Sequence, residues 1–364
     1  MGQGHPFRRA CGLRQPSRCR TGGRLWGALV LWLAVALPVG AMPAAAEVLA
    51  LLGMSPGQLA KLERGEIISQ PNQEASDKEL AMDTALYLPV PLAKVFGYLQ
   101  RAEVEGIDAD ILAHGEIAPN AGLAAFRGFA FSANQPDEVE GLLYAEPGER
   151  FNLSAEEIDS FKPLREKLAD ADRAVQAEAV SRHYQEILLG RWQAYRKGGL
   201  AGVAPYAHPE GIPAAEPAAE LRAAAVGDQT LARYYPGLNQ AWLEYPAGLP
   251  AGVAEQFFWL NRTVEGRPTA ILGHRLVQSA ADGAVIAIRH YYVGHSYNSI
   301  NLVIGCLPHR DGTLVFYSQR TSTDQVAGMA SGLKHAIGRG QMKNQMVGRL
   351  ESLRRAVKDG GRPE

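Results

Sequence analysis

The stretch that decides the fold covers residues 256–320 and reads QFFWLNRTVEGRPTAILGHRLVQSAADGAVIAIRHYYVGHSYNSINLVIGCLPHRDGTLVFYSQR. It holds five runs rich in β-branched and aromatic residues, at residues 256–264, 269–278, 284–293, 299–307 and 313–320. The segments between the runs carry turn-forming residues and are of hairpin length. Because parallel strands need much longer crossovers, the stretch predicts an antiparallel β-meander.

The hydrophobic period changes directly after this meander. From Asp324 to Val357 apolar residues recur at helical spacing, which predicts a C-terminal helix of about thirty residues. Its first half contains Gly328, Gly332, Gly338 and Gly340, and each Gly in a helix costs about 1 kcal/mol relative to Ala. We therefore expect close packing on the sheet, or a ligand against the backbone, to favour small residues there.

The chain before the meander mixes helices with short apolar pieces. Residues 82–90 predict a strand and residues 91–101 an amphipathic helix. Capping boxes at Ser55 and Ser154 predict two further helix starts. The remaining segments predict two or three short strands within residues 104–151, a long helix at 164–197, a Gly/Pro-rich loop at 198–217, and short helices at 221–225 and 231–242.

The order of these elements resembles a known superfamily. A strand, a helix with the sequence LPVPLAKVF at residues 88–96, and antiparallel strands closed by one long helix are similar to the START/SRPBCC (helix-grip, Bet v 1-like) superfamily. The resemblance implies an α+β fold in which an antiparallel β-meander grips the C-terminal helix and leaves an elongated cavity beside it. Members of the superfamily bind lipids, sterols, polyketides and other apolar molecules, and a minority are cyclases or other enzymes.

The domain organisation departs from that pattern in one region. We expect a signal peptide at residues 1–46, an N-terminal helix and linker at 47–81, a START-like domain at 82–358 and a tail at 359–364. The departure is a helical insertion at about residues 152–250.

Charge and the N-terminal residues indicate the compartment. The chain has 364 residues with 37 Lys and Arg against 38 Asp and Glu, a balance that argues against a nucleic-acid partner. Residues 1–46 carry six Arg and no acid, and residues 25–41 are apolar and uncharged. The small residues that end at Ala46 then complete a secretory signal. We expect cleavage near Ala46 and a bacterial protein that is periplasmic or secreted; the alternative is an uncleaved membrane anchor.

Alternation along the strands selects candidate ligand-binding residues. Ile286, Ile288, His290 and Tyr292 are expected to share one face of their strand, although a single β-bulge would exchange the faces. An apolar face with a few polar groups suits a pocket for a hydrophobic small molecule or lipid. The alternative is that the polar members lie at the sheet end or on a solvent face. The candidate ligand-binding residues are Phe257, Trp259, His290, Tyr292, Phe316 and Arg320.

An enzyme is the main alternative to a binding protein. His290, Tyr292 and His295 are the weak catalytic candidates for general acid–base chemistry in a cyclase-like or hydrolytic enzyme, which requires that they converge in one pocket. Residues 294–298 approach the G-x-S-x-G motif, but a strand follows where that motif needs a helix. The sequence has no metal-ligand spacing and no phosphate-binding loop, so we expect no metal and no cofactor.

Two surfaces could serve partners of other kinds. Residues 324–364 hold eight Lys and Arg against four acids, which suits peripheral contact with anionic lipids or a solvated helix face. Residues 321–325 can cap the last helix or hold an anion. The helical region 152–245 is a candidate docking surface for another protein.

Overall fold

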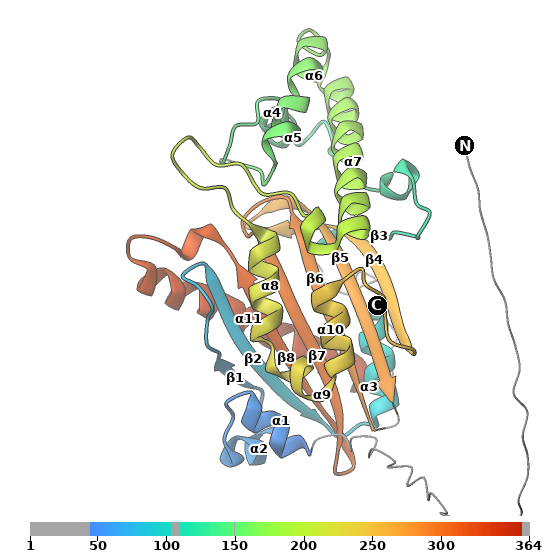
Figure 1. The fold of residues 1–364 in the computed structure, drawn as a ribbon, viewed down its shortest axis with the longest axis vertical. Coiled ribbons are helices and arrows are strands. Elements are labelled where there is room, and N and C mark those ends of the chain that lie inside the picture. The colour runs from blue at the N-terminus through green and yellow to red at the C-terminus, as the bar shows by residue number, and fades with distance from the viewer. Residues whose placement is uncertain (1–43, 103–109, 149, 281, 359–364) are drawn as a thin grey trace, which may run out of the picture. The chain divides into compact units, whose positions relative to one another are not determined.

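The computed structural model describes residues 44–102, 110–148, 150–280 and 282–358. Within these ranges the protein is α+β, with an eight-stranded antiparallel sheet in the order β1-β2-β8-β7-β6-β5-β4-β3 and helices on both of its faces (Figure 1). The strands are β1 (Ile68–Pro71), β2 (Glu79–Leu88), β3 (Ile111–Glu116), β4 (Val253–Val264), β5 (Arg267–Ala280), β6 (Gly283–Val293), β7 (Ser299–His309) and β8 (Gly312–Ser322).

The helices comprise an N-terminal pair, α3 and α4 between β2 and the insertion, the helices of the central insertion, and the C-terminal helix. None of them, over the ranges given above, is both long and apolar enough to cross a bilayer. They are α1 (Ala45–Leu51), α2 (Pro56–Glu63), α3 (Leu92–Ala102), α4 (Pro136–Leu143), α5 (Ala155–Ser160), α6 (Lys162–Lys167), α7 (Arg173–Gly198), α8 (Pro217–Gly227), α9 (Gln229–Tyr234), α10 (Pro236–Glu244) and α11 (Ser331–Lys358), with 3₁₀ helices η1 (Leu123–Phe126), η2 (Gly199–Gly202) and η3 (Asp324–Val326).

The predicted meander is confirmed. Strands β4 to β8 follow one another as antiparallel hairpins, and β2 closes against β8. The β4–β5 turn has positive φ at Glu265 (52°) and Gly266 (78°), the conformation of a two-residue turn that matches strand twist. The long C-terminal helix is confirmed as α11, but it begins at Ser331 and not at Asp324, because residues 324–326 form η3 and Gly328 and Ala330 have positive φ (78° and 59°). Both capping boxes are present, at the starts of α2 and α5.

Three segment predictions are wrong, and one of them is the short helix expected at 231–242, which is two helices, α9 and α10. The described part of residues 104–151 contains one strand, β3, and its other apolar pieces form η1, α4 and loop. Phe126, Phe129 and Leu142 there pack into the cluster beneath α7 instead of adding strands. The helix predicted at residues 164–197 is two helices, because Asp172 caps a new N-terminus by accepting hydrogen bonds from the Ala174 and Val175 N–H groups.

Residues 47–81 pack into the same fold. Val48 and Leu49 of α1 are buried under the sheet, and β1 pairs with β2. Helix α1 begins at Ala45, so the boundary predicted between residues 46 and 47 falls inside that helix. The predicted signal peptide lies mostly outside the described residues.

Helices α11 and α3 cover one face of the sheet, and side chains fill the space between them. Leu86 and Val315 of the sheet and Met346 and Leu350 of α11 have no exposed surface, so these side chains pack closely where α11 meets the sheet. The resemblance implied an elongated hollow on this side of the sheet; at these four positions side chains fill the space. Gly338 explains part of the glycine pattern, since a Cβ there would lie 2.7 Å from Leu80 Cδ1.

The central insertion covers the opposite face. In Figure 1, α8 and α10 lie in front of the sheet and α11 behind it. Residues from α7 to α10 and from α1 pack there against alternate residues of the strands. Every residue of β6 is therefore buried, and the sheet is the middle of three layers.

Candidate functional site

The sheet separates the residues predicted to line one ligand cavity. Phe257, Trp259 and Tyr292 face the insertion and belong to the apolar cluster under α7. Phe316 lies on the same side, beneath α1 and α10. His290 lies on the opposite side, with its ring 6.2 Å from that of Phe258, a member of the cluster that packs on α11.

The prediction that Tyr292 shares a face with His290 is wrong because of a bulge. The β5–β6 register shifts between Leu272 and Gly273, which pair with Tyr292 and His290. The extra residue turns both Tyr291 and Tyr292 toward α7. The Tyr292 hydroxyl lies 2.7 Å from that of Tyr184 on α7.

The catalytic candidates do not converge. His290 Nδ1 lies 3.4 Å from the Tyr297 hydroxyl, whereas His295 Nε2 lies 2.6 Å from the Thr269 hydroxyl, and Tyr292 pairs with α7. Burial lowers the pKa of His290 to about 3 and that of His295 to about 4, so both rings are neutral at pH 7. The acid–base hypothesis therefore has no common pocket for these three side chains.

Phe257 and Trp259 make close contacts within the core. Phe257 stacks on His274 at 4.5 Å between ring centroids. Trp259 Nε1 donates a hydrogen bond to the Ala125 carbonyl at 2.8 Å. The first contact joins β4 to β5 and the second holds η1 on the sheet, and the ligand-binding role predicted for the two aromatic residues stays a prediction.

Arg320 lies at an open hollow, which we call the Arg320 pocket. Its volume is about 360 Å³. It lies on the insertion side of the sheet, at the ends of β8 and α8. Its lining residues are Leu51, Leu52, Asn72, Gln73, Glu74, Ala75, Ala223, Val226, Gly227, Gln229, Thr230, Ser318 and Arg320.

Arg320 itself joins three segments that build this pocket. Its Nη1 donates to the Gln73 carbonyl at 3.0 Å and to Glu79 Oε2 at 2.9 Å. Its Nη2 donates to the Gly227 carbonyl at 3.1 Å. A Cβ on Gly227 would lie 2.8 Å from Arg320 Cζ, so a side chain there would displace the guanidinium. Arg320 on β8 pairs in register with Ala81 on β2, and this pairing fixes the backbone position from which the Arg320 side chain extends.

Two buried carboxyls lie behind the pocket wall. Asp83 pairs in register with Ser318 and accepts a hydrogen bond from Asn72 Nδ2 at 2.8 Å. Asp228 caps α9 through the Thr230 and Leu231 N–H groups. Their other oxygens, Asp83 Oδ1 and Asp228 Oδ2, are buried without a hydrogen-bond partner in the described part of the chain.

The electrostatics of this pair favour a bound proton. Burial, with the charge of Asp228 adding to it, raises the pKa of Asp83 to about 7. Burial also raises the pKa of Asp228. Taking up one proton lowers the repulsion between the two carboxyls and supplies a donor for an unpaired oxygen.

Asp83 should therefore make a contribution to stability that falls as pH rises toward neutrality, while His290 and His295, whose pKa values are lowered, contribute in the opposite direction. The folded pKa of Asp83, about 7, exceeds the unfolded value of about 4, so the folded state binds the proton more tightly. Its contribution is complete below about pH 4, is lost progressively up to about pH 7, and then stays constant. Urea unfolding at several pH values measures this slope. Asp83→Asn is the control, and an unchanged slope in that variant would contradict the assignment.

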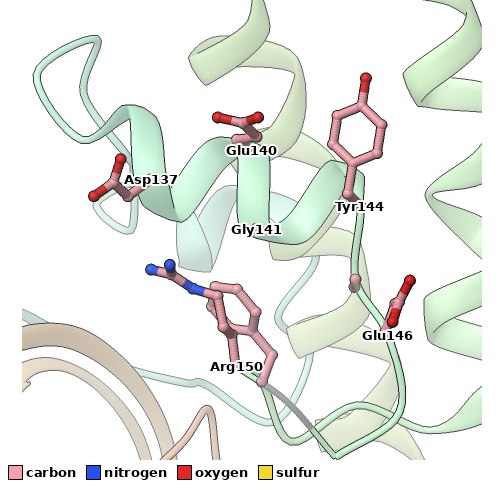
Figure 2. Close-up of a pocket in the computed structure, with 8 residues that line it drawn as sticks. Asp137, Glu140, Gly141, Tyr144, Glu146 and Arg150 are labelled. Atoms are coloured by element: carbon pink, nitrogen blue, oxygen red, sulfur yellow. The ribbon is translucent and has the colours of Figure 1, made fainter.

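A second hollow, of about 240 Å³, lies beside α4 (Figure 2). Asp137, Glu140, Glu146 and Arg150 line it, and Figure 2 shows Glu140 pointing away from Arg150 across the helix. The buried acid nearby, Glu138, accepts hydrogen bonds from Arg150 and Arg267. These ion pairs tie α4 to the sheet, and the side chains lining the hollow do not converge on a ligand.

The remaining expectations concern a metal site, which was not expected, and a protein-docking surface, which was. Over residues 44–358, apart from the gaps given above, no three His, Cys, Asp or Glu side chains are arranged to hold a metal ion. The large exposed apolar residues of region 152–245 are Val175 on α7, Ile212 in a loop and Val226 on α8. Because each lies on a different element, the docking surface stays a prediction.

Comparison with known proteins adds little to this geometry. No family model matches the chain, and no curated protein matches it. A match was found to a solved structure titled "Crystal structure of Ara h 8.0201", with 12% sequence identity and a TM-score of 0.21. The match covers 39% of this chain and 90% of that chain. The class defined by the fold itself is an α+β protein whose antiparallel sheet packs on a long C-terminal helix.

Proposed function

We propose that this chain is an exported binding protein that holds a small, largely apolar molecule or lipid in the Arg320 pocket. One observation carries the proposal: a hollow of about 360 Å³ combines apolar and polar lining residues. Leu51, Leu52 and Val226 supply apolar surface, while Ser318 and Arg320 supply polar groups. Binding sites for small molecules are usually about 300–1,000 Å³, mostly apolar, with a few polar groups that orient the ligand.

The charges at the pocket favour a neutral polar group on that ligand. The guanidinium of Arg320 already pairs with Glu79 and with two carbonyl oxygens. No net positive charge is left over for an anionic head group. A hydroxyl or amide, which both donates and accepts hydrogen bonds, suits the Ser318 and Thr230 hydroxyls better.

Export is supported by the N-terminal sequence. Residues 1–46 combine six Arg with an uncharged apolar run and small residues before Glu47. Purification of the full-length gene product from a bacterial periplasmic fraction, followed by intact-mass measurement, tests this part. Loss of the first forty to fifty residues supports export, and retention in the cytoplasm with an intact N-terminus contradicts it.

Native mass spectrometry of the same sample tests the binding. We expect a bound small molecule that organic extraction releases. Ala223→Trp and Val226→Trp place a large ring at the pocket and should abolish the adduct, because the ring occupies about the volume of a small ligand. Val175→Trp on α7 is the matched control at another exposed apolar position. Wild-type protein that is always ligand-free, or an adduct that survives both pocket variants, would contradict the proposal.

A further inference from the structure

The first turns of α11 and the turn before the helix expose large apolar side chains. Met329, Leu333 and Ile337 are 93%, 66% and 56% exposed. The spacing of four residues places Leu333 and Ile337 along one side of the helix, and Met329 lies in the turn before the helix, ahead of Ala330 with positive φ (59°). The other large exposed apolar residues of the described chain are dispersed over β3, loops and other helices, whereas Leu333 and Ile337, with Met329 close to them in the chain, form a stripe.

Packing on the opposite side of the helix fixes the orientation of this stripe. His335 Nδ1 lies 2.9 Å from Glu74 Oε2, and its Nε2 lies 2.9 Å from the Asp77 carbonyl. Arg339 Nε donates to Glu74 Oε1 at 2.8 Å. Since His335 and Arg339 are held by the loop between β1 and β2, α11 cannot rotate to bury Leu333 and Ile337.

The charged residues on the first two-thirds of α11 itself are all basic. Between residues 325 and 350 the chain carries Lys334, Arg339, Lys343 and Arg349 and no acid. Glu74 forms an ion pair with Arg339 and neutralises its charge. Lys334 and Lys343 are exposed, and Lys334 Nζ reaches the Ala327 carbonyl beside Met329. The stripe is thus accompanied by solvent-facing ammonium groups.

This basic patch belongs to an otherwise acidic molecule. Residues 47–364 carry 31 Lys and Arg against 38 Asp and Glu. A negatively charged surface would therefore repel most of the protein and attract the start of α11. Apolar side chains with flanking Lys are the pattern by which a helix lies in the plane of a bilayer interface, with the Lys stems reaching the head groups.

We propose that the N-terminal half of α11 docks on an anionic lipid surface, with Met329, Leu333 and Ile337 inserted among the acyl chains and Lys334 and Lys343 among the phosphates. This inference does not depend on the Arg320 pocket. Glu74, which holds α11, also lines that pocket, so docking would bring the pocket close to the membrane.

Vesicle co-sedimentation of the mature protein tests the proposal. We expect binding to vesicles of equal parts phosphatidylcholine and phosphatidylglycerol, and much weaker binding to phosphatidylcholine alone. The double variant Leu333→Ser, Ile337→Ser should lower the partition coefficient at least about tenfold, because two large apolar side chains no longer enter the bilayer. Lys334→Glu with Lys343→Glu should abolish the preference for the anionic vesicles.

A matched variant separates the stripe from general surface apolarity. Val175→Ser with Ile212→Ser changes two exposed apolar residues elsewhere and should leave binding unchanged. All the altered side chains are exposed, so equal melting temperatures are expected. The proposal is overturned if wild-type protein stays in the supernatant, if the Leu333/Ile337 variant binds as well as wild type, or if that variant only converts a dimer to a monomer.

Discussion

Replacement of Arg320 by Met should lower the free energy of unfolding by about 3–5 kcal/mol, because it leaves a buried carboxylate without its counter-ion. Arg320 is 5% exposed and its partner Glu79 is 2% exposed. The same change removes two hydrogen bonds that hold the Gln73 and Gly227 carbonyls. Urea denaturation, with the slope checked for two-state behaviour, measures the loss.

Two further variants separate the buried charge from a general effect of removing Arg. Arg310 pairs with Glu63 at 2.9 Å but is 63% exposed, so Arg310→Met should change stability by less than about 1 kcal/mol. The double variant Arg320→Met, Glu79→Gln removes the unpaired charge and should lose less than Arg320→Met alone. Equal losses in the single and double variants would contradict a buried ion pair.

Strand alternation was sufficient to predict one part of this pocket. Residues two apart on a strand share a face, and Leu314, Phe316, Ser318 and Arg320, which include the two predicted ligand-binding residues of β8, lie on one face. The other walls of the pocket are formed by segments whose local sequence does not predict the contacts that they make. Glu74 meets Arg339 across 265 residues of chain, and a polar stretch such as 69–79 gives no indication of such a partner.

The sequence contains features that indicate the buried carboxyl of Asp83 and the helical layer on the second face of the sheet. Asp83 stands within the apolar run MDTALYLPV, and a charged residue in such a run indicates a buried polar network. The run AVIAIRHYYV at residues 284–293 is apolar on both alternating faces, which is typical of a strand covered on both sides. The bulge that moves Tyr292 depends on packing against α7 and has no such signature.

Leu350→Ala should lower the free energy of unfolding by about 2–5 kcal/mol, because it opens a cavity between α11 and the sheet. Leu350 has no exposed surface and belongs to the cluster that joins α11 to β2, β7 and β8. Leu333→Ala, on the exposed stripe of the same helix, should change stability by no more than about 0.5 kcal/mol. Urea denaturation of the two variants compares a packed and a solvent-facing position of one helix.

A substitution in the opposite direction distinguishes a packed interior from a hollow one. Ala284 of β6 lies in the same cluster as Leu350 and is buried. If side chains fill this interior, Ala284→Leu overpacks it and should cost about 1–3 kcal/mol. In an internal hollow the added side chain would occupy empty space, and stability would stay constant or rise. A stabilising Ala284→Leu would therefore support an internal ligand cavity beside α11 as the alternative to the Arg320 pocket. If Ala284→Leu and Leu350→Ala both lower the free energy of unfolding, the Arg320 pocket on the other face stays the proposed binding site.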